Sequence, residues 1–206
     1  MKYLKIFAGA LLAGMMIAIG GAVFLALDNK VLGALFFTVG LFTICTCGFN
    51  LYTGKICYVF DHDKSYALSL PVIWLGNLAG AALVALLLSL TRQGPAFMEK
   101  AASMCEVKLN DSPLSIFILA VFCDILIYVA VDGYKNNPHE AGRYLALFFG
   151  VMVFILCGFE HCVANMFYFT MGQAWSVKTF LYLLIMTAGN SVGGVLIPLI
   201  RKKIKA

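Results

Sequence analysis

The chain has 206 residues, of which 62% are hydrophobic and 12% are charged, and its formal net charge is +5. An ordinary soluble domain carries about 25% charged residues, so this composition excludes a soluble globular domain and predicts an integral membrane protein. No basic stripe with interleaved aromatic residues is present, which excludes a nucleic-acid-binding surface. The seven cysteines lie mostly in apolar segments and form no CxxC pair, so we expect them to be small buried hydrophobic residues.

Six apolar segments follow one another along the chain, each long enough to cross a bilayer. They cover about residues 4–27, 31–60, 66–91, 113–131, 143–170 and 175–200. The second and fifth segments are longer than one crossing needs and are interrupted by glycine, so we expect them to be discontinuous helices. The sequence therefore predicts an all-α integral membrane protein with six transmembrane helices, formed by residues 1–206 as a single domain.

The basic residues between the predicted spans are divided unequally between the two faces of the membrane. One face holds ten Lys and Arg residues, including both chain ends, and the other face holds five. Cytoplasmic loops carry the excess of Lys and Arg in membrane proteins. We therefore expect a multi-pass protein of the cell's inner or plasma membrane with both termini in the cytoplasm.

Two short motifs recur at nearly one offset. The motif CGFN at 47–50 returns as CGFE at 157–160, an offset of 110, and GNLAG at 76–80 returns as GNSVG at 189–193, an offset of 113. The first match relates the second span to the fifth, and the second match relates the third span to the sixth. Because three spans is an odd number, the two halves must run through the membrane in opposite directions, as in many transport proteins.

The repeat predicts two inverted halves, about 1–91 and 113–200. In both GNxxG motifs, glycines four residues apart allow close approach of neighbouring helices. We expect the two motif asparagines, Asn77 and Asn190, to tie helices together by hydrogen bonds. Direct contact with a substrate is the alternative role for these side chains.

Polar and ionisable residues inside the apolar segments are rare and therefore informative. His161 and Glu160 lie at the predicted break of the fifth span, and Thr53 and Asn50 lie at the matching break of the second. Since both breaks converge near mid-membrane in an inverted repeat, we expect Thr53 and His161 to face each other across one pathway. A core histidine with satisfied hydrogen bonds is the alternative. Glu160 is expected to support the break by accepting backbone N–H groups.

Two further patterns near the breaks are less specific. The apolar residues Phe37, Leu41, Leu51 and Phe154 suit a pore lining or an ordinary core equally well, because periodicity does not separate the two. The Cys and His residues next to Glu160 match no usual metal-ligand spacing, so no metal is expected.

Four motifs together resemble those of the formate/nitrite transporter family. They are GFEHCVANMF (158–167), GFNLYTG (48–54), WLGNLAGA (74–81) and GNSVGGVLIP (189–198). The resemblance extends over essentially the whole chain. It implies an aquaporin-like fold of six spans, a homopentamer with one pore in each protomer, no cofactor, and passage of small anions such as formate, nitrite or hydrosulfide.

The resemblance also implies roles for individual residues. Thr53 and His161 correspond to the central pair, Lys108 to a vestibule lysine, and Asn165 to the asparagine after the histidine. One constriction is implied for Phe37, Leu41 and Leu51, and the other for Phe154. In the fourth span this chain has Asp124 where the family usually has Asn. We expect that carboxyl either to be protonated, because burial disfavours the charged form, or to pair with another group.

These observations predict a channel for small monovalent weak-acid anions, with proton coupling at His161, and not an enzyme. A hydrosulfide channel and an aquaporin-like pore for small neutral solutes are the alternatives. A membrane-embedded enzyme using Cys162 and His161 is the alternative from a different class, and it would need a further titratable partner.

Overall fold

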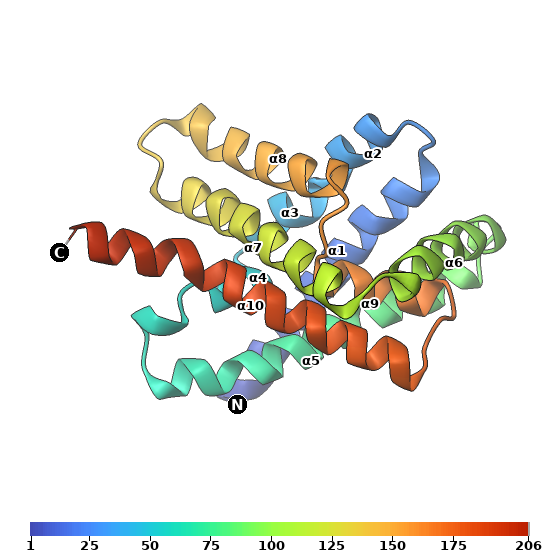
Figure 1. Cartoon of the computed structure of the whole chain (residues 1–206), viewed down its shortest axis with the longest axis horizontal. Coiled ribbons are helices and arrows are strands. Elements are labelled where there is room, and N and C mark those ends of the chain that lie inside the picture. Colours follow the sequence, from blue (N-terminus) through green and yellow to red (C-terminus); the bar gives the residue numbers. More distant parts are fainter. Residues whose placement is uncertain (206) are drawn as a thin grey trace.

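The computed structural model describes residues 1–205 and is helical throughout, with no strand in that range (Figure 1). In chain order its helices are α1 (Lys2–Ala26), α2 (Lys30–Phe37), α3 (Val39–Cys47), α4 (Tyr52–Ile56), the 3-10 turn η1 (Val59–Asp61), α5 (Lys64–Ser89), α6 (Gly94–Asn110), α7 (Pro113–Asn136), α8 (Glu140–Leu156), α9 (Cys162–Met171) and α10 (Val177–Lys205). The predicted all-α class is confirmed.

Five helical segments in residues 1–205 are long and apolar enough to cross a membrane. They are Lys2–Ala26, Lys30–Cys47, Lys64–Ser89, Pro113–Asn136 and Val177–Ile204. The predicted fifth span is divided between α8, which has 17 residues, and α9, which has 10. It is missing from the set because the chain leaves the helical conformation between these two pieces.

Two helix pairs give the molecule its frame, α1 with α5 and α7 with α10 (Figure 1). Glycines allow the backbones of each pair to approach closely. A Cβ atom added at Gly80 would overlap the carbonyl oxygen of Leu11, and one added at Gly193 would overlap that of Val121. The close approach that we predicted from the GNxxG motifs is therefore confirmed in both halves.

The helices surrounding the centre of the molecule are interrupted at two matching places. After α3 the chain turns at Gly48, where φ is 72°, and after α8 it turns at Gly158, where φ is 69°. A left-handed conformation of this kind strains any residue with a Cβ atom. The short helices α4 and α9 then begin at Tyr52 and Cys162, again 110 residues apart.

Candidate functional site

The first break is held by Asn77, which is completely buried on α5. Its Oδ1 accepts a hydrogen bond from the backbone N–H of Tyr52 at 2.8 Å. Its Nδ2 donates to the carbonyl oxygens of Ala10 at 2.7 Å and Asn50 at 2.9 Å. One side chain thus links α1, α5 and the start of α4, and satisfies backbone groups that have no helical partner at the break.

The second break is held in the same way by Asn190 on α10, which is also completely buried. Its Oδ1 accepts from the N–H of Cys162 at 2.8 Å, and its Nδ2 donates to the carbonyl oxygens of Ala120 at 2.8 Å and Glu160 at 2.9 Å. The prediction that the two asparagines tie helices together is confirmed. These hydrogen bonds use every donor and acceptor atom of both amides.

Thr53 and His161 meet between the two breaks, where both side chains are buried. The hydroxyl oxygen of Thr53 lies 2.9 Å from His161 Nε2. On the other edge of the ring, Nδ1 accepts the backbone N–H of Ala164 at 3.1 Å and so caps helix α9. A nitrogen that accepts a hydrogen bond carries no proton, so this network assigns the proton of a neutral imidazole to Nε2. Nε2–H then donates to the Thr53 hydroxyl, which leaves the hydroxyl hydrogen free.

Aromatic rings cover one side of this pair. The Phe154 ring stacks on the His161 ring at a centroid distance of 5.6 Å, and Phe37 meets Phe154 edge to face at 6.1 Å. Phe37 thus belongs with Phe154, and our expected grouping of Phe37 with Leu41 and Leu51 is wrong. The helix α2 carries Phe37 into contact with α8, a proximity that spacing along the chain does not reveal.

A cavity of about 70 Å³ lies on this side of the pair. Its lining residues are Phe24, Phe37, Met104, Lys108, Phe154, Ile155, Gly158, Phe159, His161, Ala164, Asn165 and Tyr168. Three of the predicted pathway residues, Lys108, His161 and Asn165, therefore line the same cavity. We call this space the α6-side cavity, since α6 contributes Met104 and Lys108.

The charge of Lys108 in this cavity is neutralised. Its Nζ lies 2.6 and 2.8 Å from the two carboxylate oxygens of Glu160. Asn165 Nδ2 donates to the same carboxylate at 2.8 Å. The expectation that Glu160 accepts backbone N–H groups is wrong, because its side chain turns toward α6 and an ammonium group is a stronger partner than an amide.

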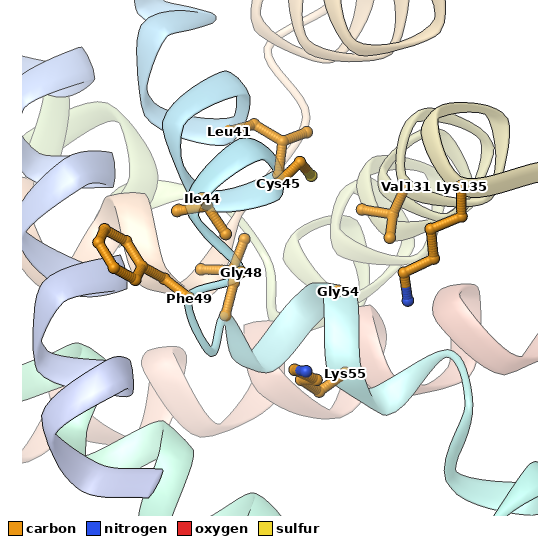
Figure 2. Close-up of a pocket in the computed structure, with 10 residues that line it drawn as sticks. Leu41, Ile44, Cys45, Gly48, Phe49, Gly54, Lys55, Val131 and Lys135 are labelled. Carbon is orange, nitrogen blue, oxygen red and sulfur yellow. The ribbon is translucent and has the colours of Figure 1, made fainter. Parts of the chain in front are cut away.

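A second cavity, of about 90 Å³, lies on the opposite side (Figure 2). Its lining residues are Leu41, Ile44, Cys45, Gly48, Phe49, Leu51, Gly54, Lys55, Val131 and Lys135. It contains the other two predicted constriction residues and two lysines that the sequence reasoning missed. The position of Lys55, two residues after Thr53 within an apolar span, was the available signal. We call this space the lysine cavity.

The two remaining predicted residues, Asn50 and Asp124, line neither cavity. Asn50 donates from its side chain to the carbonyl oxygen of Ile6 at 3.2 Å, which joins the first break to α1. Asp124 is completely buried on α7 beside Gly194, and neither carboxyl oxygen has a hydrogen-bond partner within residues 1–205. The expected pairing of Asp124 is thus wrong, and its protonation stays a prediction. In the same range no three His, Cys, Asp or Glu side chains are grouped as a metal site requires.

Comparison with known proteins identifies one family. The family model described as Formate/nitrite transporter matches residues 1–201. The uncharacterized transporter YrhG of Bacillus subtilis is 33% identical over 150 residues, which cover 68% of this chain and 56% of that protein. The nitrite transporter NirC of Escherichia coli is 26% identical over 181 residues, covering 80% of this chain and 66% of NirC. The matched region thus spans less than two thirds of either relative.

Solved structures match over a greater length. A structure described as a pentameric formate channel with formate bound aligns with a TM-score of 0.81 and 26% identity, covering 99% of this chain and 98% of that one. A second, described as an FNT family ion channel, aligns with a TM-score of 0.87 and 23% identity, covering 98% and 90% of the two chains. The similar proteins are channels and transporters.

Proposed function

The chain belongs to the formate/nitrite transporter family, and we propose that it is a pentameric channel for small monovalent weak-acid anions of the formate or nitrite type. We further infer six crossings of the cell's inner or plasma membrane, with α8 and α9 together forming the fifth and both termini in the cytoplasm. The pentameric formate channel of the same fold supports the assembly and the class of anion. The excess of basic residues at the chain ends supports the orientation.

The observation that carries this proposal is the Thr53–His161 hydrogen bond between two cavities. The α6-side cavity reaches His161, and the lysine cavity is lined by Leu51, two residues before Thr53. The proposed route runs from one cavity to the other past this pair. Lys108 and Asn165 line one approach, the pair Phe37 and Phe154 form its constriction, and Leu41 with Leu51 form the constriction on the other side.

The apolar constrictions decide which species crosses. Moving a bare carboxylate-sized ion into a dry medium costs about 20 kcal/mol in the ideal case and still several kcal/mol after relaxation. Protonating a carboxylate whose pKa is about 4 costs only about 4 kcal/mol at pH 7. Passage as the neutral acid, or as an anion that shares a proton, is therefore the cheaper route through the rings of Phe and Leu side chains.

His161 is the residue that we propose for proton sharing. Because Nδ1 is occupied by the Ala164 N–H, the exchangeable proton lies on Nε2 and points to the Thr53 hydroxyl. The hydroxyl hydrogen or Nε2–H can then donate to an anion at the centre without a second proton on the ring. Stabilising the anion by this hydrogen bond thus needs only the neutral imidazole and no opening of the cap of α9, and the proton that neutralises the anion enters with it from solution.

The test is flux into proteoliposomes at two pH values. We expect the wild type to pass formate and nitrite, faster at the lower pH, and to exclude chloride, which cannot be neutralised by protonation. Loss of one charge-assisted hydrogen bond, worth about 1.5–3 kcal/mol, predicts at least about a tenfold lower formate flux in His161→Ala and a smaller loss in Thr53→Val. Equal flux in the wild type and His161→Ala at both pH values would remove His161 from the mechanism.

One observation favours a second candidate. The Lys108–Glu160 ion pair leaves no net charge on these two residues beside His161, which suits a neutral species such as hydrogen sulfide or another small uncharged solute. Uptake of hydrosulfide, or of water and glycerol, without uptake of formate or nitrite would support a hydrosulfide channel or an aquaporin-like pore instead.

A further inference from the structure

The two ends of the molecule differ in charge. We call one the termini end, because there Lys2 bonds to Ser65, Lys202 to Phe60 and Arg201 to Asp132. This end carries ten Lys and Arg residues in the sequence against four acidic residues, Asp61, Asp63, Asp132 and Glu140. The opposite end, which carries α6, has five of each kind. The net positive charge of the protein thus lies at the termini end.

The lysine cavity opens at this positive end. Lys55 approaches it from the short helix α4 and Lys135 from α7, while Leu41, Ile44 and Cys45 of α3 line the opposite wall (Figure 2). Neither ammonium group takes part in any ion pair within residues 1–205. The Nζ of Lys135 lies 4.1 Å from the centre of the Tyr58 ring, a cation–π contact that holds it without cancelling its charge.

The acidic residues of the termini end are engaged elsewhere. Asp132 binds Arg201 at 2.6 Å, Asp61 binds Lys202, and Asp63 caps helix α5 at the N–H of Tyr66. Glu140 lines a separate outer pocket with Lys135 and is absent from the lining of the lysine cavity. Two positive charges therefore face a small, mostly apolar space with no acidic group in its lining.

The inverted repeat makes the contrast with the other cavity direct. At the offset of 110, Lys55 corresponds to Asn165 and Asn50 corresponds to Glu160. On the α6 side the matching positions supply a carboxylate, which accepts from Lys108, and an amide, which donates to that carboxylate. On the termini side they supply a neutral amide and a cation without an ion-pair partner in residues 1–205, so one cavity has a neutralised charge and the other a net positive charge.

We propose that the lysine cavity is the anion-binding site of the pathway, and that it takes small monovalent anions. This inference rests on the proposed function and adds sidedness to it: affinity for the anion is set at the termini end. About 10–15 Å³ of cavity volume is enough to hold one water, so a cavity of about 90 Å³ has room for an anion of three heavy atoms. Leu51, which lines this cavity, is two residues before Thr53, so the cavity lies beside the central Thr53–His161 pair.

The experiment compares right-side-out and inverted membrane vesicles, which present opposite faces to added formate. One unit charge about 4 Å away in bulk water contributes about 1 kcal/mol, and a threefold change in affinity corresponds to about 0.65 kcal/mol, which lies within that limit. We expect the half-saturating formate concentration at the termini face to rise about threefold in Lys55→Gln or Lys135→Gln, and about tenfold in the double variant. At the α6 face it should change little.

Two matched variants test whether position matters. Lys64→Gln removes one charge from the same end, but Lys64 is exposed and does not line the cavity. We expect wild-type half-saturation from Lys64→Gln. The double Lys55→Arg and Lys135→Arg variant keeps both charges but changes the shape of both donors, so we expect its half-saturating concentration to lie between those of the wild type and the double Gln variant. An unchanged value in the double Gln variant, or an equal rise in Lys64→Gln, would overturn the proposal.

A binding measurement separates this proposal from the channel proposal. If vesicles take up neither formate nor nitrite, the proposed function fails, and line broadening of ¹³C-formate by the purified protein decides the site by itself. We expect broadening that is lost in the double Gln variant and that chloride competes away. Equal broadening in both proteins, or competition by phosphate and not by chloride, would overturn a site for monovalent anions.

Discussion

The two breaks have the same backbone but different side chains. Both turn at a glycine with φ near 70°, and both are fastened by a buried asparagine to three backbone groups. At the residue before each short helix, however, one break has Leu51 and the other has His161. The repeat therefore duplicates the scaffold and keeps a single copy of the polar centre.

The side chains shared by the two breaks stabilise the fold, and those found at one break only are the ones that we propose for transport. Features present at both breaks satisfy backbone groups that would otherwise be exposed to an apolar medium, a need that both halves share. Features present at one break only have no counterpart at the matching positions of the other half. They include His161, Lys55 and the Lys108–Glu160 pair. Under the proposed function these single-copy residues handle the anion and its proton, and His161 in addition caps α9.

The largest expected effect comes from breaking the shared feature. Asn77→Leu and Asn190→Leu each remove three buried hydrogen bonds, and each unsatisfied buried group costs about 1–3 kcal/mol. We expect both variants to lose most of the folded oligomer, measured as the detergent-stable peak in size-exclusion chromatography. Normal assembly of one variant and loss of the other would show that the two breaks are not equivalent in the fold.

The next effect tests the charge difference between the cavities. Glu160→Gln leaves Lys108 without its counter-charge, so we expect a half-saturating formate concentration at the α6 face about threefold below the wild type. Lys108→Gln leaves a buried carboxylate and should reduce flux at least tenfold, since an unpaired buried charge costs several kcal/mol.

The double variant Lys108→Gln with Glu160→Gln is the control for that pair. It restores neutrality, so its flux should return toward the wild type. If both single variants and the double variant behave alike, the ion pair does not set the charge of the α6-side cavity.

A smaller effect concerns Asp124, which corresponds to Gly14 in the other half at the offset of 110. Its carboxyl lies against Gly194 without a hydrogen-bond partner in residues 1–205. Asp124→Asn keeps the shape and removes the acid, so we expect a thermal midpoint equal to or slightly above that of the wild type. A fall of several degrees would mean that the carboxyl binds a group such as a water or a cation.

Much of the scaffold could be predicted because its motifs occur in both halves of the sequence. The glycines, the two asparagines and the offset between them are local patterns, and the structure confirms the asparagine bonds and the close helix packing that they predict. The Thr53–His161 contact also followed from the inverted halves.

The charged and aromatic partners could not be predicted in the same way. Lys108 and Glu160 are separated by 52 residues and meet only because α6 folds back beside α9. Phe37 lies with Phe154 because α2 contacts α8, and Lys55 with Lys135 because α4 contacts α7. None of these pairs repeats in the other half, so no internal match in the sequence reveals them.

The smallest expected effect lies at the end that carries α6, opposite the termini end. There Lys100 Nζ bonds to the exposed Asp28 carboxylate at 2.8 Å. The hydrogen bond from Lys100, and then its charge, lowers the pKa of Asp28. A lowered folded-state pKa means that the contribution of Asp28 to stability is present above the unfolded pKa, about 3.9. It is lost as the pH falls through the folded-state pKa.

We therefore expect the thermal midpoint of Asp28→Asn to lie slightly below that of the wild type at neutral pH, and the two to converge in acid. The difference should also shrink in 1 M salt, because salt weakens ion pairs between exposed charges. A difference that persists in acid would trace the effect to the backbone at residue 28. The Asp28–Lys100 ion pair would then contribute little to the stability of this end.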